Sequence, residues 1–318
     1  MNSEINQSLN LNNTFLARFS QHTAENIIHD MLSIPVAPLE AEQLIEQWLG
    51  VDVSHTADGN DWQYYFNDQY AIAAVPVELL DDSQIDQATE TAYSLLFEKI
   101  NQWGYPNLIR TWNFFPDITS GHGAVDNYQL FCSGRARAYR SAAPNPVSYP
   151  AATVIGTTQP GLYVYFIASK SGGIGIENSQ QVSAFNYPRE YSQDPPLFSR
   201  ALLHRNQQQE ILFISGTASI TGHSTQYADD VNRQMEVCIS NIENLLSTAI
   251  AEHQFLPTTL QECAHIKVYL RHADDLDAIR THIRMYLGPN VPVYFLQGDM
   301  CRPDLLVEIE ALTFNDLL

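Results

Sequence analysis

The sequence has few basic residues, and this shortage narrows the classes of partner it can have. Its 318 residues include 16 Lys and Arg against 36 Asp and Glu, which gives a net charge of −20. A surface of this charge repels phosphate backbones and anionic lipid headgroups, so we expect neither a nucleic-acid nor a membrane partner. An anionic small molecule would bind only where a local group of arginines overcomes the overall field.

Other familiar signals are also missing. The four cysteines are widely spaced with no CxxC pair, which predicts reduced thiols and no structural zinc. The ten histidines form no HExxH or HxH motif, and residues 172–175 (GGIG) do not complete a dinucleotide-binding GxGxxG, so we expect neither a metal nor a cofactor. Apolar runs stay far below the ~20 residues that cross a bilayer, and the polar start lacks signal-peptide features, which predicts a cytoplasmic protein.

An internal repeat is the main organising feature of the chain. An apolar run at residues 70–76 matches residues 212–218, which lie 142 positions later. The stretches that follow carry apolar residues at helical spacing with the same offset: Tyr93, Leu96, Phe97, Ile100 and Trp103 against Met235, Cys238, Ile239, Ile242 and Leu245. Three further apolar runs pair up after unequal loops: 111–115 with 268–272, 150–156 with 292–298, and 162–165 with 305–308. The chain is therefore predicted to hold two divergent copies of one unit.

Each copy has the order strand, helix, strand, second helix or irregular segment, strand, strand, which is typical of a mixed sheet with helices packed on one face. The predicted class is α+β, with an N-terminal domain of residues 1–206 and a C-terminal domain of residues 207–318. Within the first domain the degenerate copy covers about 59–170, and residues 171–206 form a connection. The later copy has its second helix at Asp277–Leu287, which the earlier copy replaces with Gly121–Ser148; a short helix is also predicted over Pro38–Leu49.

Residues 211–218, 266–270 and 305–312 resemble a RidA (YjgF-like) domain, most clearly in the closing VEIEAL run. A wider resemblance, over roughly residues 105–318, is to the chorismatase family. It is carried by DNYQLFCSGRA (126–136), QVSAFNYP (181–188), FSRA (198–201), SGTASITGH (215–223) and residues 301–308. That family has two RidA-like halves and cleaves the enolpyruvyl ether of chorismate to release pyruvate. The resemblance implies the same tandem fold, the same substrate and no cofactor.

The chemistry of this substrate requires an unusual acid. The vinyl ether of chorismate reacts only after its terminal methylene carbon is protonated, so the enzyme needs an acid that keeps its proton near pH 7. A carboxyl group in an apolar pocket meets this need. The family motif gives the role to Glu308, which is flanked by Val307 and Ile309 and shares a strand face with Glu310. Periodicity alone favours a solvent-facing carboxylate here, and the motif reverses that preference.

The two carboxylates of chorismate call for arginines. Arg200 and Arg135 rank first because they lie in the family-like segments. Arg137 alternates with Arg135 along an expected strand, and Arg271 ends another. Any of these could instead be a surface ion-pair partner. Tyr187 is a candidate for orienting a ring hydroxyl or carboxylate, or alternatively an interface aromatic.

Small residues near position 216 and one cysteine complete the candidate site. Gly216 would let backbone N–H groups approach an anion, unless it only relieves a packing clash. Cys301 stands where the family divides: members with Cys resemble enzymes that form 3-hydroxybenzoate, with the Cys assisting aromatisation, whereas plain hydrolases carry a small residue such as Ala. Cys301 therefore favours 3-hydroxybenzoate and pyruvate as products, although a small buried thiol that fills a gap is an equal reading. Ala218 occupies a site where the aromatic-product branch prefers Gly.

Other functions stay open at this point. A chorismate hydrolase would yield a dihydroxycyclohexadiene carboxylate, and a 4-hydroxybenzoate product is not excluded. A RidA-type enamine or imine deaminase is disfavoured by Val293, which stands in place of that family's carboxylate-binding Arg. A non-catalytic metabolite-binding protein has a precedent in the earlier copy, where Tyr165 stands at the position of Glu308. The oligomeric state is open, with a homotrimer as one arrangement because RidA-like domains form trimers.

Overall fold

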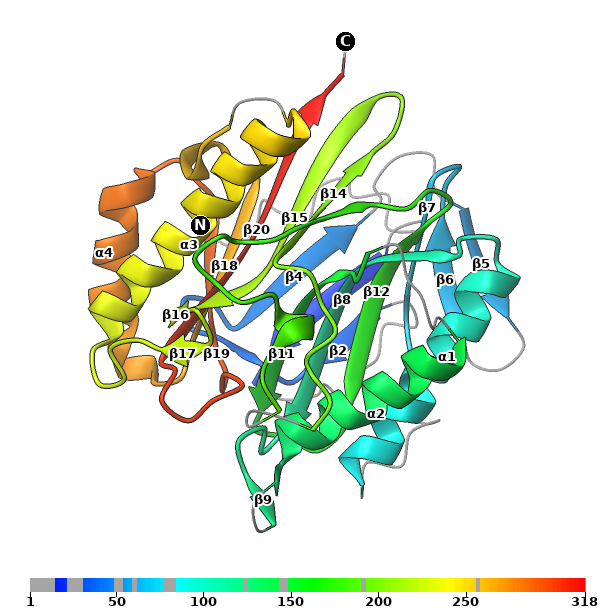
Figure 1. Cartoon of the computed structure of the whole chain (residues 1–318), viewed down its shortest axis with the longest axis horizontal. Coiled ribbons are helices and arrows are strands. Elements are labelled where there is room, and N and C mark those ends of the chain that lie inside the picture. Colours follow the sequence, from blue (N-terminus) through cyan, green and yellow to red (C-terminus); the bar gives the residue numbers. More distant parts are fainter. Residues whose placement is uncertain are drawn as a thin grey trace.

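The computed structural model describes residues 15–21, 31–48, 54–58, 62–76, 84–122, 125–142, 148–189, 193–255 and 258–317. Two large sheets face each other in the middle of the molecule, and helices cover the outer face of each (Figure 1). Helices α1 (Ile85–Gln102) and α2 (Asn127–Ala142) pack on the first sheet. Helices α3 (Val231–His253) and α4 (Leu276–Leu287) pack on the second. The α+β class is confirmed.

The two sheets have the same strand order, which confirms the repeat. The first runs β11-β8-β12-β7-β6-β5, and the second runs β13-β14-β15-β20-β18-β19 in reverse, with β3 added at its edge. The strands of the first sheet are β5 (Ser54–Asp58), β6 (Trp62–Phe66), β7 (Tyr70–Ala74), β8 (Asn107–Pro116), β11 (Ala151–Thr157) and β12 (Tyr163–Ser169). Those of the second are β13 (Ile174–Ile176), β14 (Ala201–Arg205), β15 (Gln209–Ala218), β18 (His265–Leu270), β19 (Val293–Gln297), β20 (Val307–Asp316) and β3 (Ala37–Pro38). The predicted connection, residues 171–206, thus supplies β13 and β14.

Smaller elements surround this pair of sheets. Strands β1 (Phe15–Ser20), β2 (Met31–Ile34) and β4 (Gln43–Trp48) form a three-stranded sheet that belongs to neither repeat. Two short hairpins are β9 (Gly121–His122) with β10 (Val125–Asp126), and β16 (Ile220–Thr221) with β17 (Ser224–Thr225). Short 3₁₀ helices lie at Ala184–Asn186, Leu260–Glu262 and Ala273–Asp275.

The short helix predicted over Pro38–Leu49 is wrong. Residues 37–38 form β3, and β4 pairs antiparallel with β1 over its whole length. Leu44 and Trp48 are four positions apart, a spacing that fits a helix face and alternate positions of a strand equally well. The pairing with β1 decides between the two, and this contact is not visible in the local pattern.

Two predictions for residues 121–148 are also wrong. The second helix of the repeat was expected to be missing from this segment, and Arg135 and Arg137 were expected to lie on a strand. The structure has helix α2 over most of this segment, packed against α1. Gly134 makes the close approach possible, because a Cβ there would lie 2.1 Å from the carbonyl oxygen of Asp86. The glycine and alanines thus serve helix packing. Because α2 is a helix, Arg135 is buried while Arg137 lies at the surface.

The core between the two sheets is rich in aromatic residues. Trp112 on β8 stacks on Tyr165 of β12 with ring centroids 4.5 Å apart, and Trp48 of the small sheet packs on Trp112 at 5.0 Å. Such pairs contribute about 0.5–1.5 kcal/mol each beyond the area they bury. The small N-terminal sheet is therefore anchored against the first repeat. Within the described residues, no helix is long and apolar enough to cross a membrane.

Candidate active site

Strand β20 carries two carboxylates into the space between the sheets. Val307 and Ile309 belong to the core beneath α3, so Glu308 and Glu310, which alternate with them, face the other way toward the first sheet. Glu308 is 5% exposed, and Tyr269 and Ala218 are its cross-strand partners on β18 and β15. The carboxyl group predicted to be the acid is thus an interior group on a central strand.

A bulge in β15 makes room for this carboxyl group. The register of β15 against β20 shifts between Ile214 and Thr217, and Gly216 lies in that shift. A Cβ on Gly216 would come within 1.9 Å of Glu308 Oε1, so a larger residue would collide with the carboxyl group. The Gly216 N–H donates to Thr153 Oγ1 at 3.1 Å, so in this structure it is already engaged.

The surroundings of Glu308 hold its proton at neutral pH. Burial raises the pKa of Glu308 to about 8, and the neighbouring charge of Glu310 adds to the rise, while Arg110 and Arg200 oppose it. Among the described residues, burial and nearby charges are the causes of this shift in the pKa, with no hydrogen bond among them. A buried carboxyl group of this kind can donate a proton near pH 7.

Glu310 behaves in the opposite way, although it lies on the same face of the same strand. Burial works against its ionisation, but the charges of Lys267 and Arg110 lower its pKa. Lys267 Nζ lies 2.6 Å from Glu310 Oε1, and Arg110 Nη2 lies 2.9 Å from Oε2. Trp112 Nε1 also donates to Oε1 at 2.9 Å. The strand therefore presents one protonated and one ionised carboxyl group, the pattern that acid catalysis at neutral pH requires.

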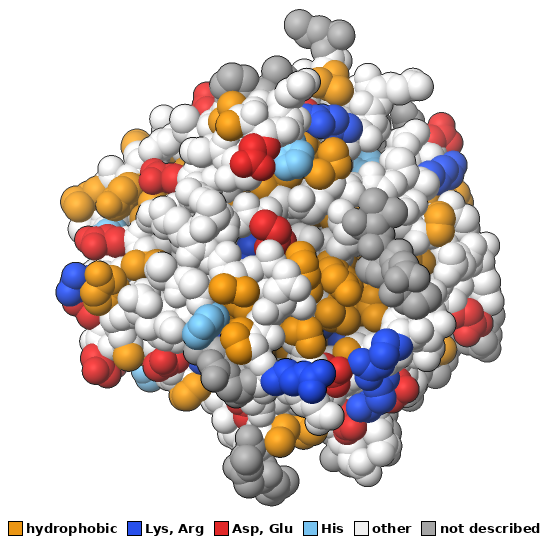
Figure 2. All heavy atoms as spheres, in the orientation of Figure 1, with side chains coloured by type: hydrophobic (Ala, Val, Ile, Leu, Met, Phe, Trp, Pro, Cys, Tyr) orange, Lys and Arg blue, Asp and Glu red, His pale blue; other side chains and the backbone are white. Residues whose placement is uncertain are grey.

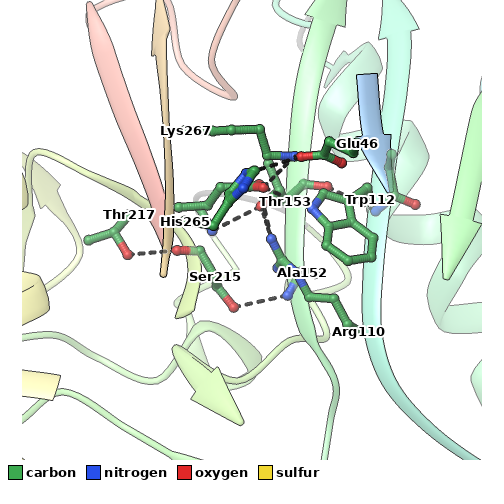
Figure 3. Close-up of polar contacts among 12 residues, drawn as sticks. Glu46, Arg110, Trp112, Ala152, Thr153, Ser215, Thr217, His265 and Lys267 are labelled. Atoms are coloured by element: carbon green, nitrogen blue, oxygen red, sulfur yellow. Dashed lines mark hydrogen bonds and ion pairs between the residues drawn. The ribbon is translucent and has the colours of Figure 1, made fainter. Parts of the chain in front are cut away.

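These partners of Glu310 were not predicted from the sequence. Arg110 and Lys267 are buried residues of β8 and β18. Figure 3 shows them near Glu46 and near Thr153 of β11, whose hydroxyl accepts a hydrogen bond from Arg110. One signal was available. The repeat that aligns residues 111–115 with 268–272 also aligns Arg110 with Lys267, which places a cation at the same position of two apolar strands. A buried cation that recurs in this way indicates a shared anionic partner.

Arg200 reaches the neighbourhood of Glu308 from the segment before β14. Its Nη2 donates to the carbonyl of Val182 at 2.9 Å and to the hydroxyl of Tyr187 at 2.7 Å. Its guanidinium also lies over the rings of Tyr187 and Phe198, 5.5 and 5.3 Å from their centroids. Among the described residues it has no ion-pair partner, and its buried Nε makes no hydrogen bond. Two residues predicted from the sequence, Arg200 and Tyr187, are thus in direct contact. The guanidinium of Arg200 is also available to bind an anionic ligand.

Arg135 is a second buried arginine without a carboxylate. It is 1% exposed, and its Nε and Nη2 make no hydrogen bond within the described residues. The guanidinium lies over the rings of Phe131 and Tyr93, 4.8 and 5.9 Å from their centroids. An unpaired buried cation is costly to the fold, so an anionic ligand would relieve a free-energy penalty there.

Cys301 lies in the loop between β19 and β20, close enough to Glu308 for the two to influence each other electrostatically. Burial raises the pKa of the Cys301 thiol to about 12, and the charge of Glu308 adds to the rise while Arg302 and Arg200 oppose it. The thiol is therefore protonated at neutral pH. It can donate a hydrogen bond but is not a base in the resting protein.

Two other predicted arginines are engaged elsewhere. Arg271 holds the Cys301 loop: it donates to Asp299 Oδ1 at 2.6 Å and to the carbonyls of Leu305 and Arg302 at 2.8 and 2.9 Å. Arg137 forms surface ion pairs with acidic residues of α1, namely Asp86 and Glu90. Both contacts fit the ion-pair reading that the sequence left open, not substrate binding.

Surface charge and cavities add little to this site. Figure 2 shows acidic side chains scattered over one face, with two neighbouring groups of Lys and Arg side chains below its centre. A cavity of about 740 Å³ is lined by residues 67–70 and 206–209 together with Ser54, Phe66, Tyr105 and Lys170, none of which belongs to the site. In the described parts of the chain, no group of three or more His, Cys, Asp or Glu side chains could hold a metal ion.

Comparison with known proteins agrees with the geometry. Residues 46–168 match the sequence profile of a family described as "Chorismatase FkbO/Hyg5-like, N-terminal". A 3-hydroxybenzoate synthase of Streptomyces hygroscopicus is 34% identical over 87% of this chain and 83% of its own. A chorismatase of Streptomyces rapamycinicus is 34% identical over 86% of this chain and 83% of its own. A crystal structure of a chorismatase superimposes with a TM-score of 0.86 at 29% identity, covering 97% of this chain and 96% of that one.

Proposed function

This chain belongs to the chorismatase family, and from that premise we propose that it cleaves the enolpyruvyl ether of chorismate with Glu308 as the general acid. The observation that carries the proposal is the pair of carboxyl groups on β20. The pKa of Glu308 is raised to about 8, so it holds a proton, while the adjacent Glu310 is ionised. A protonated carboxylic acid within the field of Arg200, which forms no ion pair among the described residues, suits an anionic, acid-labile substrate.

In the proposed first step, Glu308 transfers its proton to the terminal methylene carbon of the enolpyruvyl group. Positive charge then develops at the ether carbon, and the newly formed Glu308 carboxylate lies within the field of Arg110 and Arg200, whose charges favour its ionised form. General acid catalysis of this kind contributes typically ~10²–10⁴-fold to a rate. Water, or an oxygen of the substrate itself in the branch that forms an aromatic product, then attacks. The ether C–O bond breaks, pyruvate leaves, and the proton released by the attacking group returns to Glu308.

We assign the two substrate carboxylates to Arg200 and Arg135, with Tyr187 orienting the ligand beside Arg200. Both guanidinium groups are buried, and each has nitrogen atoms that make no hydrogen bond within the described residues. Bidentate contacts from arginine to a carboxylate are strong and directional, which fits a dianionic ligand. Gly216 and Ala218 shape the floor of the site next to Glu308.

For the products we favour 3-hydroxybenzoate and pyruvate. In this branch a nucleophile within the substrate attacks in place of water, and Cys301 assists aromatisation. The protonated state of its thiol suits a hydrogen-bond donor to the reacting ring. The alternative is hydrolysis to a dihydroxycyclohexadiene carboxylate. It is favoured by Ala218, the direct cross-strand partner of Glu308, because the aromatic-product branch prefers Gly at this position.

The test is to incubate the purified protein with chorismate, without added metal or nucleotide, and to follow pyruvate with a coupled lactate dehydrogenase assay. We expect pyruvate release, and an ultraviolet spectrum of the second product that identifies it as aromatic or diene. Glu308→Gln should abolish release. Glu210→Gln, which alters a buried carboxylate paired with Arg205 in the β14–β15 hairpin, should not. Absence of pyruvate with the wild-type protein would refute the function, and full activity of Glu308→Gln would refute the acid.

A further inference from the structure

The small N-terminal sheet, which belongs to neither repeat, places one carboxylate inside the molecule. Glu46 on β4 is 4% exposed. Its Oε1 lies 2.7 Å from Lys267 Nζ and 3.2 Å from His265 Nε2, and its Oε2 accepts a hydrogen bond from the Tyr165 hydroxyl at 2.9 Å. Although burial opposes its ionisation, the charge of Lys267 holds the pKa of Glu46 below its usual range. Glu46 is therefore a buried anion.

Contacts lead from Glu46 to the candidate acid without a break. Lys267 Nζ bridges Glu46 and Glu310, at 2.7 and 2.6 Å. Arg110 Nη2 bridges Glu310 and Thr153 Oγ1, at 2.9 and 2.7 Å, and Thr153 Oγ1 accepts from Gly216 N–H, beside the Glu308 carboxyl group. Part of this series is drawn in Figure 3. Every charged member of it is at most 5% exposed, so solvent screens these charges poorly.

The repeat explains why a third element is needed. Arg110 and Lys267 stand at the same position of their two sheets, so the duplicated fold directs two cations at a single carboxylate, Glu310. Those three charges alone would sum to +1 next to Glu308, which would favour loss of its proton. Glu46 brings the sum to zero, because it adds one anion on the far side of Lys267.

We propose that Glu46 is a positioning residue of the active site. Arg110 and Lys267 together carry one positive charge more than Glu310 balances, and Glu46 neutralises this excess charge and thereby keeps Glu308 protonated. This inference rests on the proposed function, since it assigns Glu46 to the tuning of that acid. It also gives the N-terminal sheet a part in catalysis beyond the aromatic packing by which it is anchored.

Other groups also interact electrostatically with Glu308, and the proposal leaves all of them in place. Those that influence it or are influenced by it come from α3, β8, β18, β20 and two loops: Cys238, Arg110, Tyr269, Glu310, Arg200 and Cys301. A substitution at Glu46 changes none of these side chains. A shift in the titration of Glu308 would therefore report the lost charge of Glu46 and not the loss of a neighbouring group.

The experiment is the pH dependence of kcat/KM for pyruvate release from chorismate. Activity requires protonated Glu308, so it falls as the pH rises through the pKa of that group. Because Glu46→Gln removes an anion, the pKa of Glu308 should fall. The alkaline limb, which is the part of the pH profile where activity declines with rising pH, should then move to lower pH by roughly 0.5–1 unit. Glu46→Asp retains the charge and should keep the limb at its wild-type position even if the maximal rate drops. Glu210→Gln is the matched control, a buried glutamate paired with an arginine, and should also leave the limb unmoved.

A charge-balanced double variant separates electrostatics from structure. Glu46→Gln combined with Lys267→Met removes one anion and one cation, so the limb should return toward the wild-type pH, whereas damage to packing would accumulate. An unmoved limb in Glu46→Gln, or no return in the double variant, would overturn the proposal. If the wild-type protein released no pyruvate, the proposed function would fail by itself. The inference would then be decided by measuring the pKa of Glu308 directly, with carbon-13 NMR of its carboxyl group in the folded wild-type protein and in Glu46→Gln. The Glu308→Gln variant would assign the signal.

Discussion

Gly216 lies directly against the carboxyl group of Glu308: a Cβ added to the glycine would come within 1.9 Å of Oε1. This contact fits the second of the two readings made from the sequence, in which Gly216 relieves a packing clash, and the group that would clash is the carboxyl group of Glu308. The N–H of Gly216 is bound to Thr153 in this structure. The glycine is required because the acid occupies the space where a side chain would be.

Gly216→Ala should therefore displace Glu308 and remove activity while the sheet stays folded. A misplacement of about 1 Å at a reacting group can cost 10²-fold in rate, and we expect a loss of at least that order in kcat. Gly172→Ala is the control, because a Cβ there would meet only Asn107 Oδ1 at an ordinary 3.4 Å. Steady-state kinetics and circular dichroism of both variants provide the measurement. An active Gly216→Ala enzyme would contradict the tight placement of Glu308.

Glu308 should also leave a signature in the pH dependence of stability. Its pKa is about 8 in the folded chain against an ordinary value of 4.5, so between these values the folded state binds a proton that the unfolded state has lost. Stability must then fall as the pH rises through this window. Glu308→Gln cannot lose a proton at this position. The difference between its melting temperature and that of the wild type should therefore shift in favour of the variant as the pH rises from 5 to 9. A difference between the two melting temperatures that stays constant with pH would show that Glu308 titrates normally.

Much of the fold was predictable because it depends on patterns that repeat within the sequence. The paired apolar runs, at offsets of 142, 143 and 157 residues, identified four equivalent strands of the two sheets. The equivalence of β13 and β14 with β5 and β6 was missed, because residues 171–206 were read as a connection. The errors at residues 38–49 and 121–148 have a common cause. In both places a long-range contact decides the structure, with β1 in one case and with α1 through Gly134 in the other. Local spacing does not contain such contacts.

The site was predictable to the extent that it consists of residues in recognisable motifs. Glu308, Cys301, Arg200 and Tyr187 follow from the family resemblance, and the structure brings them together or within electrostatic reach. The residues that set their electrostatics were not recognised as part of the site, although Lys267 lies in the RidA-like run 266–270. Lys267 and Arg110 are single charges inside apolar strands, and only the folded arrangement shows that they share Glu310 as a partner.

The structure separates two arginines that the sequence treated alike. Arg271→Ala would leave the carbonyls of Leu305 and Arg302 without their charged donor, and hydrogen bonds of this kind are worth about 1.5–3 kcal/mol each. We expect a loss of at least about 2 kcal/mol in the free energy of unfolding, with lower activity because the Cys301 loop is released. Arg137→Ala breaks surface ion pairs and should cost about 1 kcal/mol or less, with normal kinetics. Urea denaturation and kinetic assays of the pair test this, and equal effects would contradict the distinction.

Arg135 should contribute to binding at the expense of stability. Its guanidinium is buried without a carboxylate partner in the described chain, so Arg135→Leu removes an uncompensated charge and should leave the melting temperature unchanged or higher. The same variant should raise KM for chorismate by at least about tenfold, the equivalent of roughly 1.4 kcal/mol. Arg140→Leu, at the exposed end of α2, should alter neither property. Unchanged KM in Arg135→Leu would remove Arg135 from the binding site.

Cys301 should decide which product accompanies pyruvate. Its pKa of about 12 keeps the thiol protonated, so it can direct a hydrogen bond to the ring during aromatisation but is not needed for protonation by Glu308. Cys301→Ala should therefore retain pyruvate release within about tenfold, since a single hydrogen bond is worth roughly 0.5–1.5 kcal/mol. The second product should shift from 3-hydroxybenzoate toward the diene acid. Cys263→Ala, a buried thiol in the core beneath α3, is the control and should leave the product ratio unchanged. Chromatographic separation of the two acids measures the ratio. An unaltered ratio in Cys301→Ala would mean that Cys301 only fills space and that other residues determine the product. Ala218 would then be the next residue to exchange.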